Sequence, residues 1–334
     1  MTTRPLAFSS ALLFCTAAAG AAWWPFGPAY GKPLQTVRAL SAQGRSADVL
    51  TALNPVFMQT LRSPDLRDAY LLRGEAFEAL GRPDAALGEY QVGTGLFPKS
   101  VVLLTHEGSL LHHDGLDEHA RELFKLALGY EPKNWRAHLG LAEIESRLGF
   151  LDRSAAHYES ALEARPAQAD AWRDYAGVLF DLREPTAAEY ALHKSLDLAP
   201  NDAAAHVLLA FVLRAQDDYP GAFAQLDAAA ALGGGTGVLR AKALWLLEAG
   251  RRNDAAAAAT AILAVEPGDP VALWVRARLL LPSDPSGAAK ILEPFSARAD
   301  DAPFSARAAA VLRDAALQEA QKREKIRDAN ANAK

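Results

Sequence analysis

The residues of this sequence that could do metal chemistry are eight histidines, all between positions 106 and 206. The densest group is His106, His112, His113 and His119. Imidazoles four residues apart on one helix face can share a zinc ion. His106 and His113 are instead seven apart, and adjacent His112 and His113 point about 100° away from each other on a helix. The group therefore predicts a polar, partly exposed helix face near a turn, and no metal site.

Serine, aspartate and histidine could also assemble a hydrolytic triad. Ser109, Ser146 and Ser160 lie within predicted helices and lack the glycine-flanked turn of a nucleophile. The glycine-rich segment at 233–237 does not match a phosphate loop. It lacks the Lys-Ser or Lys-Thr pair that must follow the glycines, and no predicted strand precedes it. It predicts a loose joint between helices. The sequence thus predicts no catalytic residues, no cofactor and no enzyme.

The elements that position these side chains are marked by prolines at a fixed interval. Pro64, Pro98, Pro132, Pro166 and Pro200 are each 34 residues apart. Proline cannot continue a helix and disfavours the α conformation in the residue before it, so each one ends a helix at the same place. Such an interval indicates a chain of equal, stacked units rather than one compact enzyme domain.

Between successive prolines the pattern predicts two antiparallel helices, joined at a glycine. Apolar residues recur at helical steps from Trp135 to Gly149 and again from Ala155 to Pro166. Three ladders share the 34-residue interval: Gly81, Gly115 and Gly149; Ala86, Ala120, Ser154, Ala188 and Ala222; and Tyr90, Phe124, Tyr158, Leu192 and Leu226. Small residues let helices approach closely, and large residues fill the gap between successive pairs.

These ladders resemble the tetratricopeptide repeat family, whose signature sets large, small and aromatic residues at fixed steps before a proline. One unit carries this signature at Trp172, Tyr175, Ala176, Leu179, Ala188, Leu192, Ser195 and Pro200. The resemblance implies an all-α fold, a right-handed superhelical solenoid of antiparallel helix pairs. It also implies that Trp172 packs in the core.

The same frame divides the chain into six parts. We expect a signal peptide or N-terminal membrane anchor at 1–22, a Pro/Gly linker at 23–33, a divergent first helical pair at 34–66, an array of about six repeats at 67–269, a degenerate repeat at 270–302, and a C-terminal capping helix and tail at 303–334.

The first 22 residues have the layout of a secretory signal. Arg4 precedes an uncharged apolar stretch, which ends in small residues from Ala17 to Ala22. The stretch is also close to the roughly 20 residues that a spanning helix needs, and Trp23 and Trp24 suit an interface, so an uncleaved anchor stays open. Arg4 favours the inner side in both cases, so we expect the repeat array outside the cytoplasm, either periplasmic or anchored in the inner membrane.

Composition narrows the class of partner. The net charge is −5, from 35 basic and 40 acidic residues, and no basic run occurs before the extreme C-terminus. We therefore expect no nucleic-acid binding, and contact with a membrane only through the N-terminal segment. Cys15, the only cysteine, lies inside that segment, so a cleaved chain would have no thiol with which to form a disulfide.

In the family that this chain resembles, the first helix of each pair lines a concave groove. Its inward positions, carried onto this sequence, predict the partner-binding residues Ser109, His113, Arg136, Glu143, Arg173, Phe180, Phe211 and Arg214. Thr105, His112 and Arg147 fall at inward positions as well. Some members hold a peptide carboxylate with lysine and asparagine, but the matching places here include Leu71 and Glu75. A receptor for chaperone tails is therefore not expected.

The groove would be polar towards His113, and apolar with cationic flanks around Phe180 and Phe211. Aromatic and arginine side chains are the usual composition of a binding hot spot, although the two phenylalanines could instead fill gaps between units. The sequence thus predicts a non-enzymatic protein–protein interaction scaffold outside the cytoplasm that binds a protein or peptide segment. The alternative is an accessory substrate-binding module of an envelope enzyme complex that processes or exports glycans or polysaccharides.

Overall fold

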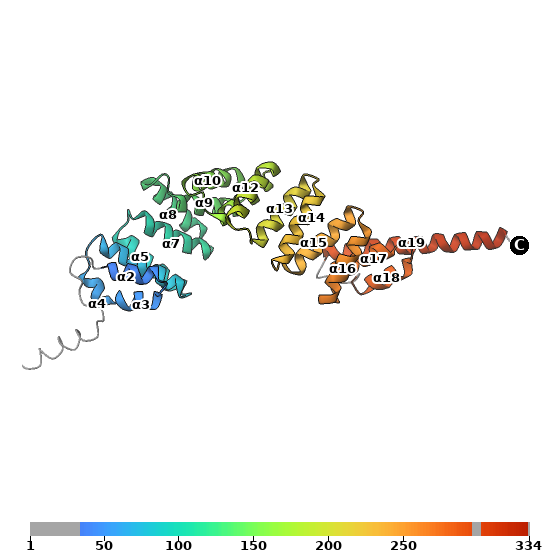
Figure 1. Ribbon diagram of the computed structural model, residues 1–334, viewed down its shortest axis with the longest axis horizontal. Helices are drawn as coiled ribbons and strands as arrows, with labels where there is room; N and C mark the ends of the chain where they lie inside the picture. The colour runs from blue at the N-terminus through green and yellow to red at the C-terminus, as the bar shows by residue number, and fades with distance from the viewer. Residues whose placement is uncertain (1–33, 296–301, 333–334) are drawn as a thin grey trace, which may run out of the picture. The chain divides into compact units, whose positions relative to one another are not determined.

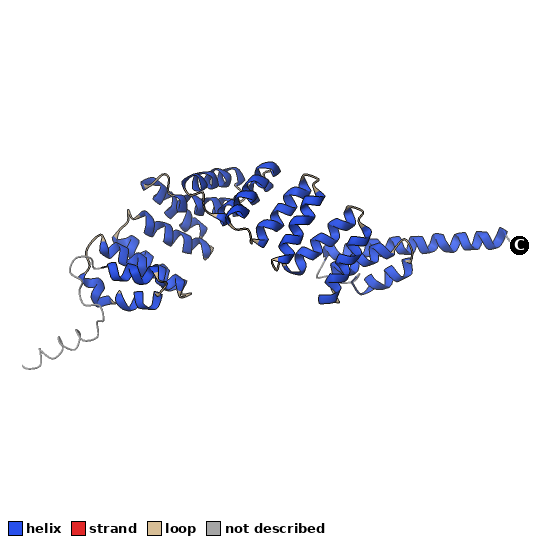
Figure 2. Cartoon of the chain, viewed as in Figure 1, coloured by secondary structure: helices blue, strands red, loops and turns tan. Residues whose placement is uncertain are grey.

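The computed structural model describes residues 34–295 and 302–332. Every regular element in these two ranges is a helix, and they contain no strand (Figure 2). The segments predicted as signal or anchor (1–22) and as linker (23–33) lie outside the described residues. None of the described helices is long and apolar enough to cross a bilayer.

The chain divides into two compact units, Met1–Ala164 and Arg165–Lys334, which we describe separately. The described part of the first unit holds helices α2 to α10 (Figure 1). Their bounds are α2 Gln35–Ala42, α3 Ser46–Ala52, α4 Pro55–Thr60, α5 Asp65–Ala79, α6 Pro83–Leu96, α7 Val101–His113, α8 Asp117–Tyr130, α9 Trp135–Arg147 and α10 Leu151–Ala164. The pairs α5–α6, α7–α8 and α9–α10 pack closely, and α6 and α8 also contact the first helices of the pairs that follow them, α7 and α9.

The second unit continues the same arrangement in its described residues (Figure 1). Its helices are α11 Ala169–Asp181, α12 Pro185–Leu198, α13 Ala203–Ala215, α14 Tyr219–Ala231, α15 Gly235–Glu248, α16 Arg252–Val265, α17 Pro270–Leu280, α18 Pro285–Leu292, the short 3-10 helix η1 Glu293–Phe295, and α19 Ala302–Asn332. The predicted all-α solenoid of helix pairs is confirmed by this architecture.

In the pairs from α5–α6 to α15–α16, a residue in the left-handed backbone conformation lies between the two helices. Gly81, Gly115 and Gly149 have φ of 68°, 78° and 80°. The next two positions on the same 34-residue ladder hold Arg183 and Asp217, which are not glycines, and these also adopt positive φ, at 67° and 64°. The turn conformation is therefore imposed by the packing of the helix pair, since side chains other than glycine enter this region only against steric resistance.

The large-residue ladder forms the core between helices. Tyr90 and Phe124 are completely buried. A Cβ atom added at Gly74 would lie 2.1 Å from the Tyr90 ring, and one at Gly140 would lie 2.3 Å from the Phe124 ring. The glycines of the first helices thus make room for the ladder residue, as ridge-into-groove packing requires.

Both ends of the array depart from the regular pair. The segment expected to be one helical pair, 34–66, contains three short helices, because Asn54 caps a new helix by accepting a hydrogen bond from the Phe57 amide (3.0 Å) and Pro55 occupies its first turn. At the other end α17 and α18 have only 11 and 8 residues. Ala308, Val311 and Ala315 of α19 cover them and complete the core.

Candidate functional site

The predicted groove residues lie on the first helices of successive pairs. We call the surface that they mark the first-helix face. Its part in the first unit comprises Ser109, His113, Arg136 and Glu143 on α7 and α9, and its part in the second unit comprises Arg173, Phe180, Phe211 and Arg214 on α11 and α13.

On α7 the structure exposes two of the predicted residues and buries a third inward position. Ser109 is exposed, and its hydroxyl donates to the Thr105 carbonyl (2.9 Å). His113 has 80% of its side chain exposed, with Nδ1 3.5 Å from Asp114. Thr105 was expected to line the groove, and this is wrong: it is only 1% exposed and donates to the Val102 carbonyl. Neighbouring helices cover that position.

Arg136 belongs to a charged network that joins four helices. Its Nη1 lies 2.7 Å from Nε2 of His106. A guanidinium only donates, so His106 accepts at Nε2 and carries its ring proton on Nδ1, which lies 3.7 Å from Glu78. The buried Tyr90 hydroxyl also donates to Glu78. Burial opposes ionisation of Glu78, but the nearby His106 imidazole and the hydrogen bond from Tyr90 outweigh it and lower its pKa.

Glu143 belongs to a second network on the same unit. Its Oε2 lies 3.5 Å from Nε2 of His112, whose Nδ1 lies 2.8 Å from Asp117. Arg147 reaches the same Asp117 carboxylate at 2.5 Å. The charged groups of this face in the first unit are therefore largely bound to one another across α7, α8 and α9.

The surface of the first unit also contains a hollow near its N-terminal helices. It is lined by side chains from α2, α5 and the start of α7, among them Arg38, Asp68, Leu71, Lys99 and Val102. Leu71 and Val102 occupy inward positions of their repeats, but the described lining of the hollow includes none of the four predicted groove residues of this unit.

Arg173 ties one helix pair of the second unit to the next. Its guanidinium lies 2.8 Å from Asp170, 3.2 Å from Asp174 and 2.7 Å from Asp202. Asp202 also caps α13, because it accepts hydrogen bonds from the amides of Ala204 and Ala205. Burial disfavours the charge on Arg173, but the bond to Asp202 outweighs it and raises the pKa of the guanidinium.

The same tie recurs at the equivalent position of a later repeat. Arg240 lies 2.5 Å from Asp269 and 2.6 Å from Glu266. Asp269 is buried and caps α17 through the Ala272 amide (2.7 Å). An arginine at this place in the repeat therefore links its own helix to the N-terminus of the next first helix, where an acidic cap is favourable.

Phe211 and Arg214 converge on a tryptophan of the next first helix. The rings of Phe211 and Trp245 are perpendicular, with centroids 4.9 Å apart. The guanidinium carbon of Arg214 lies 4.8 Å from the Trp245 ring centroid, and Nη2 is 2.8 Å from Glu248. Trp245 is 4% exposed, whereas Phe211 is 39% exposed above it. We call Phe211 and Trp245 the aromatic patch; Phe180, near the end of α11, is half-buried.

Sequence reasoning missed Trp245 and Glu248 as members of this site. Each lies 34 residues after its partner, Phe211 or Arg214. Because the repeat that holds them is one residue short, this interval did not by itself assign them to the site.

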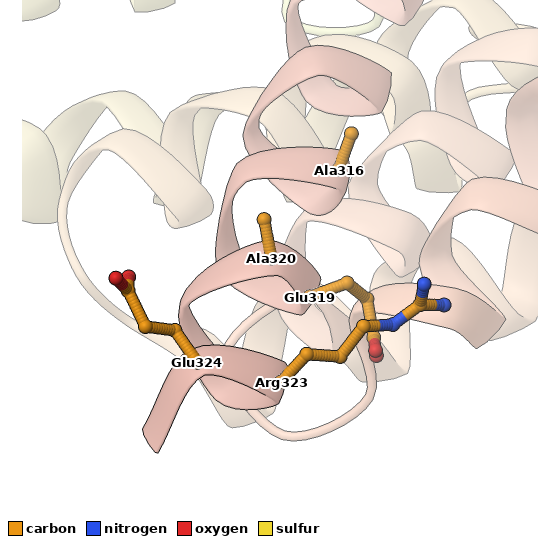
Figure 3. A pocket seen from close by; sticks show the side chains of 5 residues that line it. All are labelled: Ala316, Glu319, Ala320, Arg323 and Glu324. Atoms are coloured by element: carbon orange, nitrogen blue, oxygen red, sulfur yellow. The ribbon is translucent and has the colours of Figure 1, made fainter. Parts of the chain in front are cut away.

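A hollow beside α19 is a poor candidate for a site. Figure 3 shows Glu319 and Arg323 alongside each other, while Glu324 points to the other side of the helix. The described lining residues all come from this one helix, so no groups converge from facing elements. Likewise, no group of three histidine, cysteine, aspartate or glutamate side chains within 34–295 and 302–332 could hold a metal ion.

Comparison with known proteins agrees with the fold. A tetratricopeptide repeat family model matches residues 34–101 and 145–203. No curated protein matches the chain.

The solved structures that are similar to this chain include three with TM-scores between 0.51 and 0.54. PilF from Pseudomonas aeruginosa is 19% identical, with 62% of this chain and 94% of that one covered and a TM-score of 0.53. The C-terminal part of a TPR repeat-containing protein from Cytophaga hutchinsonii is 17% identical, with 72% of this chain and 97% of that one covered and a TM-score of 0.54. PilW, a type IV pilus biogenesis factor, is 17% identical, with 58% of this chain and 89% of that one covered and a TM-score of 0.51. At these identities the similarity shows the fold alone.

Proposed function

Because a tetratricopeptide repeat model matches two stretches of the chain and the fold is a solenoid of helix pairs, we propose that the protein is a non-enzymatic scaffold that binds a segment of a partner protein along the first-helix face. Proteins with this repeat serve in general as protein-binding scaffolds, and partner contact is the coarse function that the fold supports. The observation that carries the proposal is the aromatic patch, where Phe211 is 39% exposed and packs on the buried Trp245. Exposed aromatic groups on a rigid base are favoured as binding anchors.

We propose further that the array works outside the cytoplasm. The support is the sequence of residues 1–22, in which a basic residue precedes an apolar stretch and small residues follow. Contact with a membrane would be confined to this segment, and the chain would bind no nucleic acid. Location is tested by protease added to intact spheroplasts of the host: an external array is digested, whereas a cytoplasmic array survives until the cells are lysed.

Partner binding is tested with a photo-crosslinking amino acid placed in the full chain in its host. One variant carries it at Ser109, which is exposed on the first-helix face. The matched control carries it at Leu126, which is 43% exposed on α8, the second helix of the same pair. We expect a discrete crosslinked product from position 109 only. Equal products from both positions, or none from either, would contradict the proposal.

A further inference from the structure

We propose that the aromatic patch of the second unit selects an uncharged, apolar side chain of the partner segment, rather than an acidic one. This inference rests on the proposed function and specifies the partner chemistry at one part of the same face. It refines the expectation from sequence, in which Arg173 and Arg214 are cationic flanks of an apolar part of the groove.

The first step is that the arginines of this face are already neutralised. Arg173 contacts three carboxylates, of Asp170, Asp174 and Asp202. Arg214 is paired with Glu248 at 2.8 Å. An acidic partner group would have to compete with carboxylates that the array holds within contact distance, so the positive charge offers it little net attraction.

Other charged groups around the patch reinforce this balance. Arg240 on α15 is bound to Glu266 and Asp269, and Lys242 on the same helix is bound to Asp227. Because these cations on the helix of Trp245 are also paired with carboxylates, they offer an anionic ligand little net attraction.

The second step is that the exposed part of the patch is apolar and rigidly supported. Phe211 packs perpendicular to Trp245, and the Arg214 guanidinium of the same helix also contacts the Trp245 ring. The Arg214–Glu248 pair lies beside the rings, so it can shield an apolar contact from water in the manner of a polar rim. An aromatic or branched apolar side chain would gain contact area and ring stacking against Phe211.

The test uses the purified full chain and a phage-displayed library of random dodecapeptides. Peptides are selected on the unaltered protein and counter-selected on the Phe211→Ala variant. We expect the peptides that depend on Phe211 to be enriched in Phe, Trp, Leu and Ile and not in Asp or Glu. A selected peptide should bind the variant at least about tenfold more weakly, and its affinity should change little between low and high salt, because screening acts on charges.

The control is Tyr190→Ala, which removes an aromatic side chain that is 60% exposed on α12. We expect that change to leave peptide binding unaltered. If Phe211→Ala impairs folding, Phe211→Leu serves in its place, since leucine keeps apolar contact with Trp245 but loses ring stacking.

The outcomes separate this inference from the broader proposal. Peptides that are acidic and lose affinity with salt, or that bind the Phe211 variants as well as the unaltered protein, overturn the apolar anchor and leave the scaffold function standing. If the library yields no peptide that binds the chain, both proposals fail.

Discussion

The indole nitrogen of Trp172 donates a hydrogen bond to the carbonyl oxygen of Pro166, at 2.8 Å. His138 and His206 occupy the equivalent places in the preceding and following repeats. Their Nε2 atoms lie 3.0 Å from the Pro132 carbonyl and 3.1 Å from the Pro200 carbonyl. The periodic prolines therefore end a helix and also present a carbonyl acceptor to a ring N–H of the next first helix.

This relationship predicts that Trp172→Phe destabilises the second unit. The change keeps most of the ring packing but leaves the Pro166 carbonyl without its indole donor, at a cost of about 1 kcal/mol. Urea unfolding followed by circular dichroism measures the loss. The matched control is Trp274→Phe, because Nε1 of Trp274 is buried without a hydrogen-bond partner among the described residues. Removing that donor should be neutral or stabilising, and equal losses in the two variants would count against the role of the carbonyl.

Charge reversal at Arg173 should act on stability, although the sequence alone would suggest it as a test of the groove. Arg173→Glu places a fourth carboxylate beside Asp170, Asp174 and Asp202, so we expect a loss of about 1 to 2 kcal/mol after allowance for solvent screening. Differential scanning calorimetry checks it. Arg276→Glu, on the exposed surface of α17, is the control and should change the melting temperature little. An unchanged melting temperature for Arg173→Glu would mean that the ion pairs of Arg173 contribute nothing to the stability of the fold.

The His138–His157 pair predicts a loss of stability in mild acid. The two Nδ1 atoms lie 2.9 Å apart, and His157 Nε2 lies 3.7 Å from the buried Glu145. Burial, followed by the neighbouring His138, lowers the pKa of His157 below its usual 6.5. The folded chain then binds fewer protons than the unfolded chain, so stability is complete above about pH 6.5 and falls as the pH drops through the folded pKa.

His157→Gln should flatten this dependence, as measured by urea midpoints between about pH 7.5 and pH 5.5. Glu145 acts in the opposite direction at lower pH, because burial raises its pKa from 4.5 and protonation relieves its cost. The other charged groups nearby are Arg153 on α10 and Arg121 and Lys125 on α8. A variant that loses stability in acid as steeply as the unaltered protein would exclude His157 as the cause.

Gly140 and Gly88 should respond oppositely to alanine. At Gly140 a Cβ would lie 2.3 Å from the buried Phe124 ring, so Gly140→Ala forces the core to shift and should cost about 1 to 3 kcal/mol. At Gly88, an exposed position inside α6, nothing lies within 4 Å of such an atom. Gly88→Ala should stabilise the chain by about 0.5 to 1 kcal/mol. Thermal unfolding of both variants measures the two changes in stability. If Gly140→Ala leaves the stability unchanged, the Phe124 ring can move to make room for the added methyl group.

Local pattern alone determined the helix pairs, their glycine turns and the buried ladder. Tyr90, Phe124, Leu192 and Leu226 were assigned to the core from their spacing, and all four are completely buried. This succeeded because periodicity is a property of the chain itself: residues 34 apart meet the same neighbours once equal units stack.

Only the tertiary structure decided which inward residues are free to meet a partner. Spacing placed both Phe211 and Arg173 on first helices. It did not reveal that Arg173 forms ion pairs with three carboxylates, or that Phe211 packs against Trp245. Nor did it reveal that Thr105 is covered. Those outcomes depend on ångström-scale distances between side chains of different helices, which a one-dimensional pattern does not contain.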